Sequence, residues 1–281
     1  MATTYTRHPG WRGWQYGRSM QPEGGHLVPV APAYGEGCVT GLVPALMEGD
    51  LVAGGWPSWI PDEVLGARRT LLLVLDGLGW EQLQERRSTA PTLTGFAGGA
   101  ITTVAPSTTA AALTSIATGE PPGRHGVVGY RIAVGGPDRP THSEVLNVLR
   151  WSTGGGDARR RHDPRDFQPC EVFGSQWPPV VTREMFADSG FTAAHLSDTR
   201  LLGYRDRSGL VDRVIEAFGG GEPFVYAYWD DIDRTAHEFG LADRYEDELA
   251  ACDAMVGELA ERLPAGTAIV VTADHGLVHV G

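Results

Sequence analysis

The chain has 281 residues, of which 42% are hydrophobic and 21% charged, a composition typical of a folded globular protein. Its 35 acidic residues outnumber its basic residues, and a formal net charge of −12 argues against binding to a nucleic acid polymer. All 23 basic residues are arginines, which excludes both a Schiff-base lysine and the lysine of a P-loop.

Signals for export or membrane insertion are not visible in the sequence. Residues 1–30 contain no apolar segment of the secretory type, and no later run approaches membrane-spanning length. Three cysteines lie far apart and form no C-x-x-C pair, so a disulfide framework is not expected: Cys38, Cys170 and Cys252. We therefore expect a cytoplasmic protein without a membrane partner, and the sequence does not indicate its oligomeric state.

Residues 1–32 are rich in glycine, proline and single aromatic residues, and they show neither helical nor strand periodicity. We expect an irregular N-terminal extension there, and a folded domain over residues 33–281. Within that domain, residues 133–179 include a polar, glycine-rich stretch among scattered aromatic residues. This stretch predicts a loop-rich cap or insertion.

Three unbroken apolar runs, at residues 70–75, 223–229 and 268–272, are typical of parallel strands covered by helices on both faces. The apolar spacing elsewhere predicts helices at residues 41–51, 109–118, 182–188, 210–218 and 245–263. Weaker strand patterns lie at residues 100–104 and 192–196. Strands that alternate with helices predict an α/β fold with a mostly parallel sheet sandwiched between helices.

Each of the three apolar runs leads into metal-ligand side chains: Asp76 after the first, Asp230, Asp231 and Asp233 after the second, and Asp274 and His275 after the third. The carboxyl ends of parallel strands border the crevice where ligands bind. Asp233 and His237 are four residues apart, which places them on one face of a helix. Carboxylate oxygens and imidazole nitrogens are both zinc ligands. Together these residues predict a site for one or two divalent cations, although each alone is more typical of a turn or a helix cap.

A hydroxyl-rich segment, Pro106-Ser107-Thr108-Thr109, precedes the helix expected at residues 109–118. A helix N-terminus presents unpaired N–H groups and a partial positive charge, so it can bind a phosphate and favour an alkoxide. Serine and threonine are also the preferred N-cap residues of any helix, and capping alone would explain them. The predicted metal site is what favours the catalytic interpretation.

Four motifs follow one another along the chain: Leu75-Asp76-Gly77; Pro106 to Thr109 with Thr118-Gly119-Glu120-Pro121-Pro122-Gly123-Arg124-His125-Gly126; Asp233-x-x-x-His237; and Thr272-Ala273-Asp274-His275-Gly276. In this order they resemble the nucleotide pyrophosphatase/phosphodiesterase family of the alkaline phosphatase superfamily, over residues 68–281. The resemblance implies an alkaline phosphatase-like catalytic domain with two divalent metal ions, expected to be zinc. It also implies that Thr109 is the nucleophile and contacts the metal. One ion would be held by Asp76, Asp274 and His275, and the other by Asp233 and His237.

Two parts of the family's pattern are matched differently in this chain. The family's second metal also takes a third histidine from a later segment, whereas the only histidine after His275 is His279. We therefore expect the sequence to lack the C-terminal part of the domain. The family also binds a phosphate oxygen through an asparagine soon after its His-Gly motif. Tyr130 stands near that place and the nearest asparagine is Asn147, so both are carried over as substrate-binding candidates.

The resemblance thus predicts a metal-dependent hydrolase that cleaves small-molecule phosphate diesters or nucleotide pyrophosphates through a phosphothreonine intermediate. A phosphomonoesterase of the same superfamily stays open, because loops set that preference. A protein that binds metal and nucleotide without turnover also stays open, because the third histidine is missing. A sulfatase is disfavoured, since no Cys/Ser-x-Pro-x-Arg motif occurs.

Overall fold

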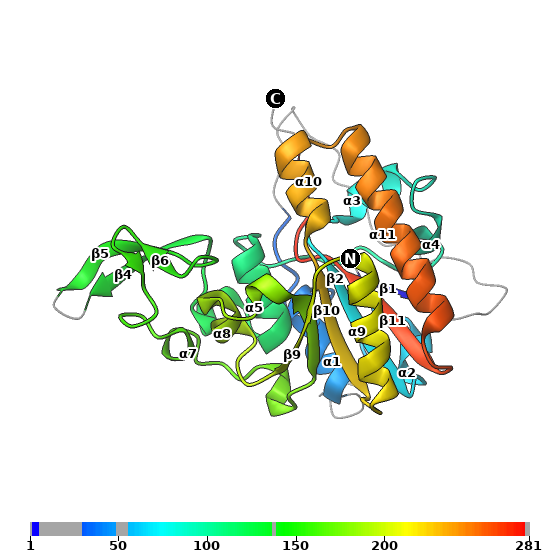
Figure 1. Ribbon diagram of the computed structural model, residues 1–281, viewed down its shortest axis with the longest axis horizontal. Helices are drawn as coiled ribbons and strands as arrows, with labels where there is room; N and C mark the ends of the chain where they lie inside the picture. The colour runs from blue at the N-terminus through cyan, green and yellow to red at the C-terminus, as the bar shows by residue number, and fades with distance from the viewer. Residues whose placement is uncertain (1, 6–29, 49–55, 137–138, 279–281) are drawn as a thin grey trace.

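A mostly parallel sheet of seven strands runs through the molecule in the order β3-β1-β11-β2-β10-β8-β9 (Figure 1). The computed structural model describes residues 2–5, 30–48, 56–136 and 139–278. Five neighbouring strands are parallel: β11 (Thr267–Thr272), β2 (Arg69–Leu75), β10 (Phe224–Trp229), β8 (Pro179–Arg183) and β9 (Arg200–Tyr204). At one edge, β1 (Ala2–Tyr5) runs antiparallel between β11 and β3 (Ala97–Gly99). The expected α/β fold is confirmed.

Helices cover both faces of the sheet because side chains of the central strands alternate between two buried cores. Leu72 and Val74 of β2 enter one core, whereas Leu71, Leu73 and Leu75 enter the other. Burying one such leucine stabilises the fold by about 1.5–3 kcal/mol. The main helices of the first face are α1 (Leu42–Glu48), α5 (Thr109–Thr118) and α8 (Gly190–His195). Those of the second are α4 (Pro91–Thr94), α9 (Arg207–Gly219) and α11 (Asp243–Arg262).

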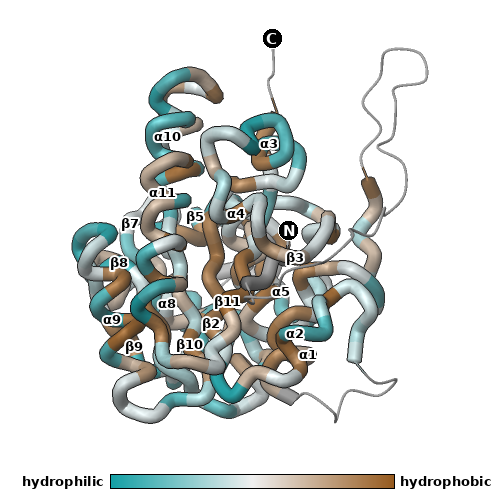
Figure 2. The backbone as a smooth tube through the Cα atoms, turned by 90° about the vertical axis from the view of Figure 1, so that its right-hand side faces the viewer, coloured by the Kyte–Doolittle hydropathy of each residue, from teal (hydrophilic) through white to brown (hydrophobic). Residues whose placement is uncertain are grey.

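One helix, α10 (Asp231–Phe239), rises beyond the end of the sheet directly after β10 (Figure 1). Hydrophobic residues concentrate along the central strands, whereas much of α10 is hydrophilic (Figure 2). Short elements complete this part of the fold: η2 (Val39–Gly41), α2 (Asp62–Leu65), α3 (Trp80–Glu85), α6 (Pro122–His125) and η5 (Glu184–Phe186).

The region expected as a loop-rich cap contains a second, antiparallel sheet that projects to one side of the molecule (Figure 1). Its elements are β4 (Arg131–Gly136), β5 (Arg139–Asn147), β6 (Ser152–Thr153) and β7 (Gly156–Asp157), followed by α7 (Pro164–Phe167) and η4 (Phe173–Ser175). Trp151 anchors this region. It is 1% exposed and packs edge-on against Phe167, and a Cβ atom at Gly190 would lie only 2.4 Å from its Cβ.

Three expected elements are wrong or displaced. Residues 182–188 were expected to form a helix, but β8 continues to Arg183 and only the single turn η5 follows. Residues 192–196, a weak strand pattern, lie mostly in α8, where the Ser189 hydroxyl caps the helix by accepting the N–H of Thr192 at 3.0 Å. A short apolar run fits a buried strand or a buried helix equally well. Here the Ser189 cap favours the helix. The strand expected at 100–104 is displaced to β3, and Thr102 forms only an isolated bridge with Cys38.

The N-terminal extension, expected to be irregular, contributes strand β1 to the sheet. A segment of four residues is too short to show periodicity, and its conformation depends on the strand partners that β11 and β3 supply. Residues 6–29 of that extension lie outside the described residues.

No helix in the described ranges is both long and apolar enough to cross a membrane. The three cysteines are all free thiols, as the absence of a C-x-x-C pair predicted. Cys38 and Cys252 are buried, and Cys170 is partly exposed.

Candidate active site

Asp76 and Asp274 lie side by side because of the sheet register. β2 and β11 are parallel neighbours, with Val74 opposite Thr272, and each aspartate comes two residues later. Side chains alternate along a strand, so Asp76 continues the face of Leu72 and Val74, which packs under α5. Both carboxylates are buried, with Asp76 3% exposed and Asp274 fully enclosed.

Gly77 allows the chain to turn after β2 and to approach α10 closely. Its φ is +73°, a conformation that disfavours residues with a side chain, and its N–H donates to Asp274 Oδ1 at 3.1 Å. A Cβ atom at this position would lie 2.9 Å from both Cβ and Oδ1 of Asp233. Glycine at position 77 therefore lets three aspartates converge.

His275 stands at the centre of the convergence, and its ring orientation is fixed. Its Nδ1 lies 3.1 Å from the carbonyl oxygen of Gly276. Because a carbonyl can only accept, Nδ1 carries a proton, and in the neutral ring Nε2 offers its lone pair to the site. Nε2 lies 3.1 Å from Thr109 Oγ1, 3.4 Å from Asp76 Oδ1 and 3.6 Å from Asp274 Oδ2. Thr109 is the first residue of α5, so its hydroxyl meets this group at a helix N-terminus.

The carboxylates facing His275 suit a divalent cation. Asp76 Oδ1, Asp233 Oδ1 and Asp274 Oδ2 are buried and accept no hydrogen bond from any described group. An unpaired buried charge is strongly unfavourable, and a cation would compensate all three oxygens. Asp76, Asp274 and His275 each offer a ligand atom, all within 4.8 Å of one another, and over the described ranges they form the one such group. Carboxylate oxygens and imidazole nitrogens are both zinc ligands.

The electrostatics of the site agree with this view. Burial raises the pKa of Asp76 well above its usual range, and the neighbouring Asp274 and Asp233 raise it further. Burial likewise raises the pKa of Asp233, although His275 and His237 oppose the shift. Carboxyl groups whose pKa is raised in the absence of a cation are expected where a bound metal ion would supply the compensating positive charge.

The first turns of α10 place Asp233 and His237 on one helix face, as their spacing predicted. Asp233 Oδ1 lies 4.0 Å from His275 Nε2, and Asp233 Oδ2 lies 3.4 Å from His237 Nε2. The side chain of His237 is 73% exposed. The predicted ligands therefore extend from the buried pair Asp76 and Asp274 to the solvent-facing His237.

Asp230 and Asp231, the two aspartates between β10 and Asp233, are held by Arg183. The guanidinium of Arg183 at the end of β8 pairs with both carboxylates and lies over the ring of Trp229, 5.0 Å from its centroid. All three members of this cluster are largely buried, with side chains 13–17% exposed. The cluster therefore fixes the start of α10. Of the three aspartates that follow β10, Asp233 is the one that faces His275.

Tyr130 and Asn147 lie next to each other, in the second sheet and the segment before it. Asn147 Nδ2 donates to the Tyr130 hydroxyl at 2.8 Å, and Asn147 Oδ1 accepts the N–H of Arg150. A Cβ atom at Gly129 would lie 4.0 Å from Pro106, which places this segment beside the loop that leads to Thr109. His279, the last candidate ligand, lies outside the described residues.

Two side chains that support the site were missed by sequence reasoning. The Tyr228 hydroxyl donates to Asp76 Oδ2. Gln82 binds the segment after His275 twice, because its Nε2 donates to the carbonyl of Leu277 at 2.8 Å and its Oε1 accepts the N–H of Leu277 at 3.3 Å. Tyr228 lies inside a strand and Gln82 in α3, so only the strand order and the loop path could have revealed them.

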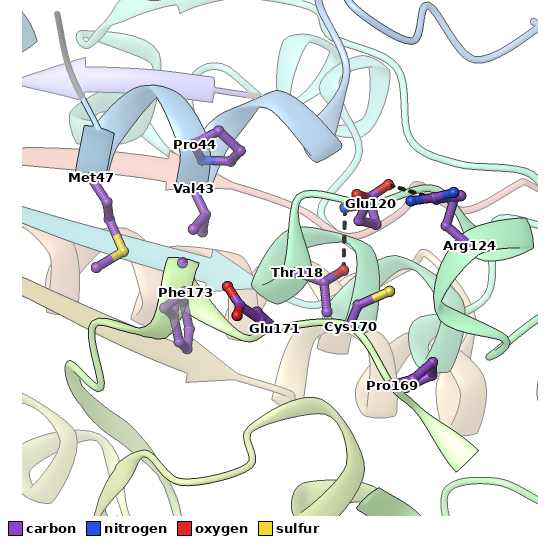
Figure 3. A pocket seen from close by; sticks show the side chains of 11 residues that line it. Val43, Pro44, Met47, Thr118, Glu120, Arg124, Pro169, Cys170, Glu171 and Phe173 are labelled. Atoms are coloured by element: carbon purple, nitrogen blue, oxygen red, sulfur yellow. Dashed lines mark hydrogen bonds and ion pairs between the residues drawn. The ribbon is translucent and has the colours of Figure 1, made fainter. Parts of the chain in front are cut away.

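A cavity of about 400 Å³ lies at the opposite end of α5 from Thr109. Thr118 and Glu120 line it together with α1 and the segment around Cys170, and Glu120 pairs with Arg124 at 3.6 Å (Figure 3). Ten residues of helix separate the two ends, a rise of about 14 Å. None of the predicted site residues lines this cavity.

Comparisons with known proteins agree with the architecture. The sequence profile of the family described as type I phosphodiesterase / nucleotide pyrophosphatase matches residues 70–281. Two structures of murine ectonucleotide pyrophosphatase / phosphodiesterase 5, one an inactive threonine-to-alanine variant in complex with AMP, superpose with a TM-score of 0.50 at 18% identity. The alignment covers 74% of this chain and 57% of that chain, so this chain spans little more than half of the murine protein. A protein of Pyrococcus horikoshii superposes with a TM-score of 0.42 at 12% identity, over 75% of this chain and 83% of that one. No curated protein has a significant sequence match.

Proposed function

Because the chain belongs to the type I phosphodiesterase / nucleotide pyrophosphatase family, we propose that it hydrolyses phosphate diesters or nucleotide pyrophosphates at the site around Thr109 and His275. One observation carries the proposal: Thr109 Oγ1 lies 3.1 Å from His275 Nε2, beside three buried carboxylate oxygens that accept no hydrogen bond from the described residues. A hydroxyl placed next to a cation-binding group has the arrangement of an activated nucleophile.

In this proposal Asp76, Asp274 and His275 hold one divalent ion next to Thr109, and Asp233 and His237 supply ligands to a second. Zinc suits the donor set of the first group. Ions bound there would lower the pKa of the Thr109 hydroxyl and neutralise negative charge on the transferring phosphoryl group. A site without lysine can therefore still support this chemistry.

The Thr109 oxygen attacks phosphorus in line with the leaving group. Thr109 Oγ1 loses its proton and forms a bond to phosphorus while the bond from phosphorus to the departing oxygen breaks, which gives a phosphothreonine that retains the other ester group of the substrate. Water then cleaves the bond between Thr109 Oγ1 and phosphorus, which releases a phosphate monoester and restores the Thr109 hydroxyl. The N-terminal N–H groups of α5 lack intrahelical partners and carry a partial positive charge, so they can bind the phosphate oxygens during both steps.

Nucleotides are the proposed class of small-molecule substrate. The murine protein with the same fold is described in complex with AMP, and family membership points to nucleotide pyrophosphates. Tyr130 is 40% exposed, and with Asn147 it remains a proposed substrate contact. The cytoplasmic location stays a prediction.

Hydrolysis of bis(p-nitrophenyl) phosphate by the purified chain tests the proposal. We expect turnover that a chelator abolishes and zinc restores, and a fall in kcat of about 10³-fold or more in Thr109→Ala. Thr118→Ala is the matched control, since it removes the same hydroxyl from the other end of α5. Undiminished turnover in Thr109→Ala would refute the nucleophile.

The same sample separates the two alternatives. Faster hydrolysis of p-nitrophenyl phosphate than of the diester would indicate a phosphomonoesterase. Stabilisation by zinc and AMP without turnover of either substrate would indicate a protein that only binds these ligands.

A further inference from the structure

We propose that Tyr228 is a positioning residue whose hydroxyl fixes the carboxylate of Asp76 so that its free oxygen faces the cation site. The inference rests on the proposed function, in which Asp76 is a metal ligand. Tyr228 itself touches neither metal nor substrate in this proposal and acts only through Asp76.

The two buried aspartates, Asp274 and Asp76, share one pattern of hydrogen bonding. Asp274 Oδ1 accepts the N–H groups of Gly77 and His275, at 3.1 and 2.9 Å, while its Oδ2 has no partner among the described groups. Asp76 Oδ2 accepts the Tyr228 hydroxyl, while its Oδ1 is the unpartnered oxygen, 3.4 Å from His275 Nε2. In each carboxylate one oxygen is held and the other is available.

The donors differ in one respect that makes the inference testable. Asp274 is held by backbone N–H groups, which side-chain truncation does not remove, whereas Asp76 is held by one side chain. Without the Tyr228 hydroxyl, Asp76 Oδ2 would be a buried carboxylate oxygen with no donor among the described residues, and rotation of the carboxylate would no longer be opposed.

The position of Tyr228 is set by the sheet and not by a loop. It lies in β10 directly opposite Val74 of β2, two residues before Asp76, and it is 8% exposed. Because both strands lie inside the sheet, the ring has little freedom to move away from Asp76. A donor on a rigid element is the arrangement expected for a group that orients a metal ligand.

Tyr226 provides a matched control from the same strand. It lies two residues before Tyr228 on the same face and is 1% exposed, and its hydroxyl is buried without a hydrogen-bond partner in the described parts of the chain. Tyr226→Phe thus removes a buried hydroxyl at the same level of burial without removing a bond to Asp76.

The test is the zinc affinity of the purified, metal-free chain, measured by competition with a chromogenic chelator. We expect Tyr228→Phe to weaken zinc binding by about 10- to 100-fold, and Tyr226→Phe to bind zinc like the wild type. Excess zinc should restore diesterase kcat in Tyr228→Phe, because the role concerns ligand orientation. Equal affinity in Tyr228→Phe and wild type would overturn the inference, and so would equal weakening in both variants. Absence of zinc binding by the wild type would instead refute the proposed metal site.

A double-mutant cycle shows whether Tyr228 acts through Asp76. In the Asp76→Ala background, Tyr228→Phe should cause no further loss of zinc affinity, and an additional loss of tenfold would contradict the mechanism. If Tyr228→Phe does not fold, zinc binding should still change the tyrosine ultraviolet absorbance of Tyr226→Phe, because the Tyr228 hydroxyl donates to a carboxylate that is proposed to bind the metal. An unchanged spectrum would overturn the inference.

Discussion

Substitution of Gly77 by alanine should damage both stability and the metal site. The left-handed φ of +73° disfavours a side chain by about 1–2 kcal/mol. The new Cβ would also lie 2.9 Å from Asp233, and forcing an extra carbon into a packed site destabilises by about 1–3 kcal/mol. The two terms together give a loss of about 2–5 kcal/mol in the free energy of unfolding. Displacement of Asp233 should in addition lower diesterase kcat.

Gly221→Ala is the control, because it would place a side chain at a positive φ without bringing its Cβ atom close to another group. Its φ is +91°, and a Cβ there would meet nothing within 4 Å. Urea unfolding of the metal-free proteins should show a loss of about 1–2 kcal/mol for Gly221→Ala, with unchanged activity once zinc is added. Equal unfolding free energies for the two variants, together with full activity of Gly77→Ala, would refute the reasoning from close approach.

Two further predictions concern a buried histidine and a largely buried ion-pair cluster. Burial lowers the pKa of His125 from 6.5 to about 4, so the unfolded chain binds this proton more readily. The stability that results from the neutral histidine is present above pH 6.5 and is lost as the pH falls toward 4. Over that range the wild type should lose about 3 kcal/mol more of its free energy of unfolding than His125→Gln. Equal losses in urea titrations of the two proteins would contradict this prediction. Arg183→Met should destabilise by about 3–5 kcal/mol, because Asp230 would be left largely buried without its cation and Asp231 would keep only its pair with the exposed Arg234. Arg262→Met, which removes an exposed arginine that also pairs with two carboxylates, should change stability by less than about 1 kcal/mol in the same assay; similar losses would show that burial does not matter.

The central sheet could be predicted because its strands are unbroken apolar runs, and parallel order then brought their acidic ends to one edge. Asp76, Asp274 and His275 converge for that reason. β8 and β9 could not be predicted in the same way, because they are short and β9 at the sheet edge is only partly buried. The pattern instead predicted a helix at residues 182–188, where β8 ends and a single turn follows.

The roles of individual acids depended on partners far away in sequence. The spacing to His237 singled out Asp233, but the role of Asp230 and Asp231 as partners of Arg183, nearly fifty residues earlier, could not be predicted. Tyr228 looked like an ordinary strand residue, because its bond to Asp76 depends on the pairing of β10 with β2. Local patterns predict which residue types gather at a site, whereas long-range pairing decides what each of them does.

The most direct test of the account is whether Thr109 carries the transferred phosphoryl group. The zinc-loaded chain should be mixed with bis(p-nitrophenyl) phosphate, quenched in acid within the first turnovers, digested and analysed by mass spectrometry. We expect one p-nitrophenyl phosphoryl group esterified to the peptide that contains Thr109, absent after chelation and absent in Thr109→Ala. Rapid turnover with no covalent adduct in the wild type, or with an adduct on another residue, would contradict the proposed mechanism.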